Sequence, residues 1–157
     1  MLVKGINDTD LINYKKISMF IAFPKCTYKC EKECGKRVCQ NGALAKLPDV
    51  EVSIDHIIEL YSKNILTHAI VCGGLEPMDS WEDLYELIKE IRKHTEDDIV
   101  IYTGYNYNEI SDKILLLSDF KNIIIKFGRY IPDQEKHYDD ILGVDLASDN
   151  QHARKIS

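Results

Sequence analysis

The sequence predicts an α/β fold with a mainly parallel sheet. Short continuous apolar runs alternate with segments whose apolar residues recur at helical spacing, which is typical of βαβ units. The apolar runs are unbroken rather than alternating, as expected of strands that are covered on both faces. Its 157 residues suit one domain, which we expect to span residues 1–157, and are too few for an eightfold barrel of about 250 residues.

Four apolar runs are predicted strands, because each is short and ends at residues that break regular structure. Pro24 ends the first run and Gly73 the second, whereas a Thr-Gly-Tyr turn follows the third. The predicted strands are Ile17–Phe23, His68–Cys72, Ile99–Tyr102 and Asn122–Phe127. We expect the buried Cys72 thiol only to fill space in the core.

Three helices are predicted between these strands, over about 53–64, 80–91 and 108–117. Ser53 is a suitable N-cap for the first helix, and Ser80 with Asp83 resembles a capping box at the start of the second. One face of the second helix is apolar at helical spacing, formed by Trp81, Leu84, Leu87, Ile88 and Ile91. The carboxyl ends of the four strands would then meet at one rim, where such sheets gather ligands.

The composition argues against several classes of function. With 26 acidic and 20 basic residues the formal net charge is −6, which is unusual for a nucleic-acid-binding domain. No apolar run approaches the roughly 20 residues of a membrane span. Asp8 and Asp10 interrupt the N-terminal segment, so we expect no signal peptide and a cytoplasmic location.

Four of the five cysteines lie close together in a long loop over about residues 24–48, and they are Cys26, Cys30, Cys34 and Cys39. Cytosolic thiols stay reduced, so a cluster of this kind indicates metal binding rather than disulfides. Structural zinc sites favour gaps of two residues between paired cysteines, whereas the gaps here are three, three and four. The spacing therefore favours an iron–sulfur cluster, and a zinc-binding interaction module is the non-enzyme alternative.

The turns that follow two other predicted strands have a composition that suits ligand binding. Gly73-Gly74-Leu75-Glu76-Pro77 follows the second strand, and its glycines allow backbone groups to approach a ligand closely. Thr103-Gly104-Tyr105 follows the third strand. After residue 130 the periodic pattern fades, so residues 131–157 are predicted to be an irregular, acidic C-terminal segment.

Five motifs in this order resemble the radical S-adenosylmethionine (SAM) activating enzymes, above all the activators of anaerobic ribonucleoside-triphosphate reductase. The resemblance runs from about residue 17 to the C-terminus. The motifs are Cys26-x3-Cys30, Gly73-Gly74-Leu75-Glu76-Pro77, Thr103-Gly104-Tyr105, Gly128-Arg129-Tyr130 and Ser148-Asp149-Asn150-Gln151. The resemblance implies a partial (βα) barrel of the small radical SAM type.

The resemblance also implies the activity and its cofactors. A [4Fe-4S] cluster on three thiolates would bind SAM and cleave it to a 5′-deoxyadenosyl radical, which would form a glycyl radical on the large subunit of the reductase. The electron would come from a low-potential donor such as flavodoxin or ferredoxin. The implied SAM-binding residues are Gly73, Gly74, Glu76, Thr103, Gly104 and Tyr105. No catalytic residue beyond the cluster ligands is implied, nor any nucleic-acid or membrane partner.

The sequence departs from the family pattern at two points. The third thiolate is either Cys34, which lies one residue too far from Cys30, or Cys39, which restores the family's Cys-x-Asn ending at Asn41. The Asn41 match favours Cys39. Leu75 is an extra residue before Glu76, which leaves open whether Glu76 contacts the cofactor. Activation of another glycyl radical enzyme, or radical SAM chemistry on another substrate, remains the alternative within the family.

Overall fold

The computed structural model describes all residues, 1–157. The strands are β1 (Leu2–Val3), β2 (Gly5–Asp10), β3 (Ser18–Phe23), β4 (Val50–Glu51), β5 (Ala69–Gly74), β6 (Asp98–Tyr102), β7 (Ile123–Phe127), β8 (His137–Asp139), β9 (Val144–Leu146) and β10 (His152–Lys155). The α-helices are α1 (Lys29–Cys34), α2 (Gly42–Ala45), α3 (Ile54–Lys63), α4 (Trp81–Ile91) and α5 (Ser111–Leu117). Two 3-10 helices are η1 (Pro77–Ser80) and η2 (Tyr107–Glu109).

The α/β class and the mainly parallel sheet are confirmed. The central sheet has six strands in the order β10-β7-β6-β5-β3-β2, and β3, β5, β6 and β7 pair in parallel. Its two outer strands, β10 and β2, pair antiparallel with their neighbours and form the edges. The sheet does not close into a barrel, and the predicted partial barrel stays a prediction.

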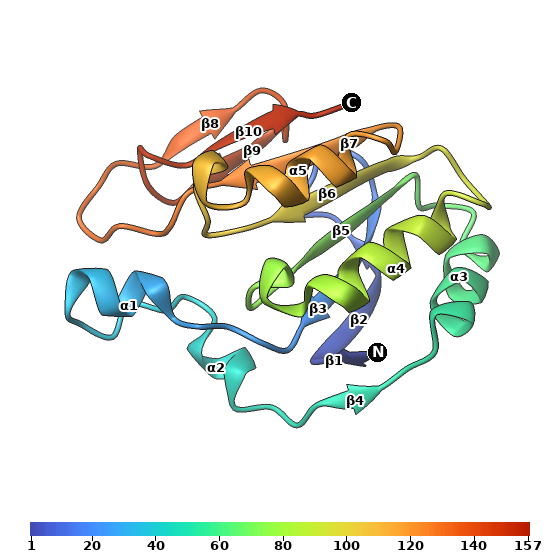
Figure 1. Ribbon diagram of the computed structural model, residues 1–157, viewed down its shortest axis with the longest axis horizontal. Helices are drawn as coiled ribbons and strands as arrows, with labels where there is room; N and C mark the ends of the chain where they lie inside the picture. Colours follow the sequence, from blue (N-terminus) through green and yellow to red (C-terminus); the bar gives the residue numbers. More distant parts are fainter.

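The sheet is covered on both faces, which accounts for its unbroken apolar strands. Helices α4 and α5 lie over the same face (Figure 1), and their buried residues join those of β3, β5, β6 and β7 in the larger core. On the other face, alternate strand residues such as Val71 and Val100 pack with Leu142 and Leu146 from the β8–β9 region. Cys72 is completely buried in the larger core, as predicted.

The C-terminal segment differs from its prediction. Residues 131–157 are not irregular throughout, because β8 and β9 form a hairpin and β10 extends the main sheet beside β7. An apolar pattern could not reveal β10 as a strand, because its sequence is polar and only Ala153 of its four residues is buried. Backbone pairing with β7 therefore determines the strand, rather than an apolar pattern.

Two local predictions are also corrected. Ser80 is the N-cap residue of α4, but its side chain accepts no capping hydrogen bond and its buried hydroxyl has no partner. The capping is done one turn earlier, where Glu76 accepts from the Met78 backbone N–H at the start of η1. The cysteine segment is not a plain loop either, because it contains α1 and α2. In Figure 1, α1 projects away from the body of the molecule.

No helix in the chain combines the length and the apolar character that a membrane crossing requires.

Candidate iron–sulfur and cofactor site

A large cavity lies at the carboxyl ends of the four parallel strands. It has a volume of about 490 Å³, and its lining comes from all four strand ends. These contributions are the cysteine segment after β3, the glycine turn after β5, the Thr-Gly-Tyr turn after β6, and Lys126 with residues 128–130 at the end of β7. The rim predicted from the sequence is therefore a single cavity, of the size that holds small cofactors.

Three of the four clustered cysteines reach this cavity. Cys26, Cys30 and Cys39 all contribute to its lining, whereas Cys34 does not. The Cys34 thiol lies one helical turn beyond Cys30 and points to backbone carbonyls, 3.4 Å from that of Lys36 and 3.8 Å from that of Glu31. All five cysteines of the chain are free thiols.

The thiols that line the cavity influence one another. Burial is the main cause that raises the pKa of Cys26, to about 11, and the charge of Cys30 adds to the effect. A hydrogen bond from the Tyr28 backbone N–H to the Cys26 sulfur acts in the opposite direction. Burial likewise raises the pKa of Cys30, and the charge of Cys39 is the next cause. No three His, Cys, Asp or Glu side chains are arranged to hold a single metal ion.

The cysteine segment is tied to the glycine turn at its far end. The Asn41 side-chain amide donates to the Gly74 carbonyl over 2.5 Å, two residues after Cys39. Gly74 itself has φ +85°, and a Cβ there would lie 2.8 Å from the Cα of Ala22. Only glycine fits at this point, because the backbone of β3 leaves no room for a side chain. The Asn41 contact holds the segment that carries Cys39 against the turn.

Glu76 is the buried carboxylate at the floor of the cavity. It is 6% exposed, and its two oxygens accept hydrogen bonds from Thr103 Oγ1 at 2.7 Å, Gly104 N at 2.8 Å and Met78 N at 3.1 Å. The extra Leu75 therefore does not remove Glu76 from the site. Burial raises its pKa to about 7, although these three hydrogen bonds act to lower it. A carboxylate has about four acceptor sites, so one remains for a ligand.

Lys126 is a buried ammonium in the lining of the same cavity. It lies in β7 beside Tyr102 of β6, is 7% exposed, and donates to the Gly128 carbonyl at 2.9 Å. Burial lowers its pKa to about 8, and the negative charge of Glu76 partly offsets that effect. Sequence reasoning missed Lys126, although a lysine within the apolar run Ile123–Phe127 is a signal that could have found it.

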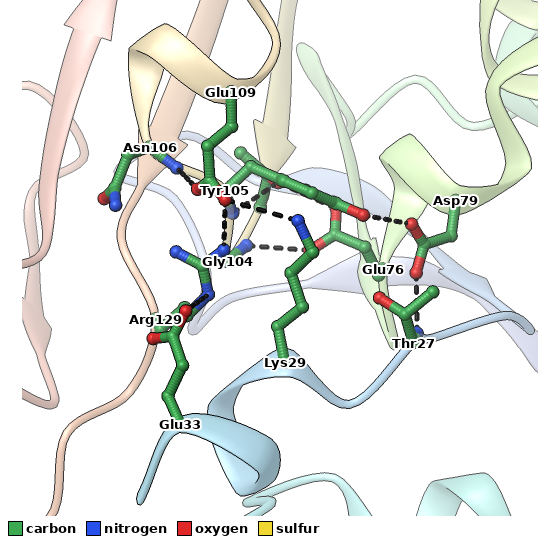
Figure 2. Close-up of polar contacts among 11 residues, drawn as sticks. Thr27, Lys29, Glu33, Glu76, Asp79, Gly104, Tyr105, Asn106, Glu109 and Arg129 are labelled. Carbon is green, nitrogen blue, oxygen red and sulfur yellow. Dashed lines mark hydrogen bonds and ion pairs between the residues drawn. The ribbon is translucent and has the colours of Figure 1, made fainter.

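A polar network joins the cysteine segment to the turn after β6 (Figure 2). Asp79 accepts from the Thr27 backbone N–H at 2.7 Å and from the Tyr105 hydroxyl at 2.6 Å, and thus joins η1 to the segments that follow β3 and β6. Asp79 was also missed, because nothing in its local sequence distinguishes it from an ordinary helix-start aspartate. Thr103, Gly104 and Tyr105 therefore serve the site partly by positioning Glu76 and Asp79.

A second group of charges fixes α1 to the body of the protein (Figure 2). Glu109 forms ion pairs with Arg129 and, at 3.2 Å, with Lys29 of α1. The hydrogen bond from Arg129 is the main cause that lowers the pKa of Glu109 to about 2. Arg129 Nε also lies 3.3 Å from Glu33 Oε1, although without hydrogen-bond geometry. Lys29 and Arg129 line the cavity, so this group forms part of its wall.

The closing motif of the chain supports the turn after β7. Gly128 has φ +97°, and its carbonyl accepts from the Gln151 side chain at 3.2 Å as well as from Lys126. The Asn150 side-chain amide donates to the Arg129 carbonyl at 2.8 Å. The Gly-Arg-Tyr and Ser-x-Asn-Gln motifs, which are more than 15 residues apart in the sequence, thus form one unit beside the cavity.

Comparison with known proteins indicates an iron–sulfur protein. No curated protein and no solved structure matches the chain. A family model described as a 4Fe-4S single cluster domain matches residues 15–151, which include all the site residues described above. The match supports an iron–sulfur cluster over the zinc alternative. The chain therefore belongs to the family of 4Fe-4S single cluster domains.

Proposed function

We propose that this protein is a radical SAM activating enzyme that forms a glycyl radical on an anaerobic ribonucleoside-triphosphate reductase. One observation carries the proposal: three cysteines of the 4Fe-4S family domain line the same cavity as the glycine turn, Glu76 and the Thr-Gly-Tyr turn. An iron–sulfur cluster alone, used only to carry electrons, has no need of an adjoining cavity of about 490 Å³.

Cys26, Cys30 and Cys39 are the proposed cluster ligands. Three protein thiolates leave one iron of a four-iron cluster without a protein ligand, so that iron can bind SAM. When bound, the cluster supplies the electron that cleaves the sulfonium of SAM. The chain's own part is to hold, orient and shield the two cofactors.

Glu76 and Lys126 suit the amino-acid portion of SAM, which carries an ammonium and a carboxylate. They are a buried acidic and a buried basic group in one cavity, and the charge of Glu76 acts to raise the pKa of Lys126. Glu76 has an acceptor site left for an ammonium, and Lys126 has two N–H donors beyond its bond to Gly128. A zwitterionic ligand would satisfy both, whereas a simple anion or cation would leave one buried charge without a partner.

The mouth of the cavity suits a protein substrate. Ile12 contributes to the lining while 77% of its surface is exposed, so the chain itself leaves apolar surface uncovered there. A protein partner that inserts a glycine-bearing loop would cover this surface and exclude water. A small-molecule substrate would instead require a lid to do so.

The proposal predicts that the anaerobically reconstituted protein, given a low-potential reductant, converts SAM to methionine and 5′-deoxyadenosine. With the large subunit of the reductase present, electron paramagnetic resonance should detect a glycyl radical. Cys30→Ala, which removes a proposed ligand, is the negative control. Intact SAM in the presence of a fully loaded cluster would contradict the proposal, whereas SAM cleavage without a glycyl radical would contradict only the choice of partner.

A further inference from the structure

The segment that carries the four clustered cysteines is rich in basic residues, although the whole protein is acidic. The segment 24–48 holds six Lys or Arg and two Glu, which gives it four net positive charges. Because the whole chain has a net charge of −6, the remaining residues carry ten net negative charges. The segment that carries the proposed cluster ligands is thus opposite in sign to the rest of the protein.

Five of these six basic side chains are exposed and take part in no ion pair, and they are Lys25, Lys32, Lys36, Arg37 and Lys46. We call them the basic face. Elsewhere most exposed lysines have acidic partners, such as Lys63 with Glu59, Lys89 with Glu86 and Lys93 with Glu90. The sixth basic residue of the segment, Lys29, is paired with Glu109.

The basic face lies outside the lining of the cavity. None of its five residues lines the cavity, whereas Cys26, Cys30 and Cys39 of the same segment do. The segment therefore has an inner side that presents thiols to the cofactor site and an outer side that presents cations to solvent. Neither acidic residue of the segment forms an ion pair with these cations: Glu31 accepts from the Cys39 backbone N–H, and Glu33 lies beside Arg129.

We propose that the basic face is the docking surface for a small acidic electron-transfer protein that delivers one electron to the cluster. This inference rests on the proposed function, which needs repeated reduction of the cluster. The donor loses one electron and the cluster gains it, and no bond forms or breaks. Electron transfer weakens steeply with distance, so a donor on the outer side of the cysteine segment is close to the cluster while the cavity stays open to its substrate. Opposite charges also steer such a donor to this face and speed its association.

The test measures reduction of the reconstituted full-length protein in the absence of SAM, with reduced flavodoxin as the acidic probe. Anaerobic stopped-flow spectroscopy follows the one-electron-oxidised flavin. At low ionic strength the K32E/K36E/R37E variant should be reduced at least about tenfold more slowly than the wild type. The difference should shrink to about twofold or less near 0.5 M salt, where screening confines charge effects to a few ångströms.

A matched variant controls for net charge. K63E/K89E/K93E makes the same charge change at exposed positions on and just after α3 and α4, which lie away from α1 (Figure 1). It should be reduced at close to the wild-type rate. A photoreduced deazaflavin, which is small and uncharged, should reduce all three proteins equally. K32Q/K36Q/R37Q, which removes the charges without reversing them, should show an intermediate slowing and serves if the first variant loads its cluster poorly.

Three results would overturn the inference. One is a K32E/K36E/R37E variant that flavodoxin reduces as fast as the wild type at low salt. Another is equal slowing of both charge-reversed variants, which would show an effect of net charge alone. The third is loss of heparin binding by K32E/K36E/R37E with no change in reduction, which would assign the basic face to a polyanion. Because SAM is absent, none of these results depends on whether the protein cleaves SAM.

Discussion

Cys39→Ala is expected to abolish assembly of the iron–sulfur cluster, whereas Cys34→Ala is expected to leave a full cluster. Both thiols were candidates for the third ligand on spacing alone. The expectation rests on the lining of the cavity, which includes Cys39 with Cys26 and Cys30 but not Cys34. With only two thiolates left at the cavity, the Cys39→Ala protein should lose essentially all bound iron and sulfide.

The backbone around the two thiols explains why they differ. Cys34 ends α1, and Gly35 follows it with φ +66°, which turns the chain away from the helix. Cys39 comes four residues after that turn, and the Asn41 bond to Gly74 brings this part of the segment back to the strand ends. The Cys34 thiol is left against the carbonyl of Lys36, on the solvent side of the segment.

The measurement is iron and sulfide content after anaerobic reconstitution, together with the visible charge-transfer absorption of the cluster. Cys26→Ala and Cys30→Ala should behave like Cys39→Ala. Cys72→Ala is the control, because that thiol is completely buried in the core and is not part of the cavity lining. A full cluster in Cys39→Ala with none in Cys34→Ala would show that the ligand set is Cys26, Cys30 and Cys34.

The sequence predicted those parts of the fold that burial decides. Strands β3, β5, β6 and β7 begin and end within two residues of the predicted runs, because both of their faces are covered and each is nearly all apolar. Helix α3 begins where Ser53 predicts it, since the Ser53 hydroxyl accepts from the His56 backbone N–H. In these elements local composition and tertiary environment favour the same structure.

The parts that were missed depend on partners distant in the sequence. β2 has the polar sequence Gly-Ile-Asn-Asp-Thr-Asp and forms a strand because β3 offers it a backbone edge. Ser80 has the sequence features of a cap, but its buried hydroxyl has no hydrogen-bond partner, and the side chain that caps is Glu76, at the start of η1. Asp79 and Lys126 belong to the site only because the fold brings β3, β6 and β7 together. Short motifs could show which strand ends form the site, but not which side chains from different strands contact one another there.

Replacing Glu76 by alanine is expected to destabilise the protein by about 3 kcal/mol, since two buried backbone N–H groups lose their acceptor. Those donors belong to Met78 and Gly104, while the Thr103 hydroxyl can turn to another partner. Thermal unfolding should show a melting temperature lower by roughly 10 °C for a chain of this length. Glu135→Ala is the matched control, because Glu135 is exposed and should change stability by less than about 0.5 kcal/mol.

Glu76→Gln tests the charge of the same side chain while keeping its shape. The ionised carboxylate accepts from Thr103, Met78 and Gly104. A protonated carboxyl can instead donate to Thr103 while it still accepts from the Met78 and Gly104 backbone N–H groups. A glutamine cannot, because its NH₂ group must replace one of the two oxygens. The backbone N–H of either Met78 or Gly104 then faces the glutamine NH₂ group, which cannot accept its hydrogen bond. Glutamine is therefore expected to destabilise the protein rather than to be neutral.

The pH dependence of this loss has a definite sign. Burial raises the pKa of Glu76 from 4.5 to about 7, so between these values the folded chain keeps a proton that the unfolded chain has released. The stabilising contribution of the neutral carboxyl is thus complete below pH 4.5 and disappears as the pH rises through about 7, a change of about 3 kcal/mol. Glutamine does not titrate, so Glu76→Gln should lose most stability relative to the wild type near pH 5 and least above pH 7.

Urea unfolding at intervals from pH 5 to pH 8 measures this difference. Subtracting the Glu76→Gln profile from that of the wild type removes the contributions of all other groups that titrate alike in both proteins. Glu135→Gln should give a profile parallel to the wild type, since that side chain is exposed. Parallel profiles for Glu76→Gln as well would mean that Glu76 is ionised across this range, with its three hydrogen bonds outweighing the effect of burial.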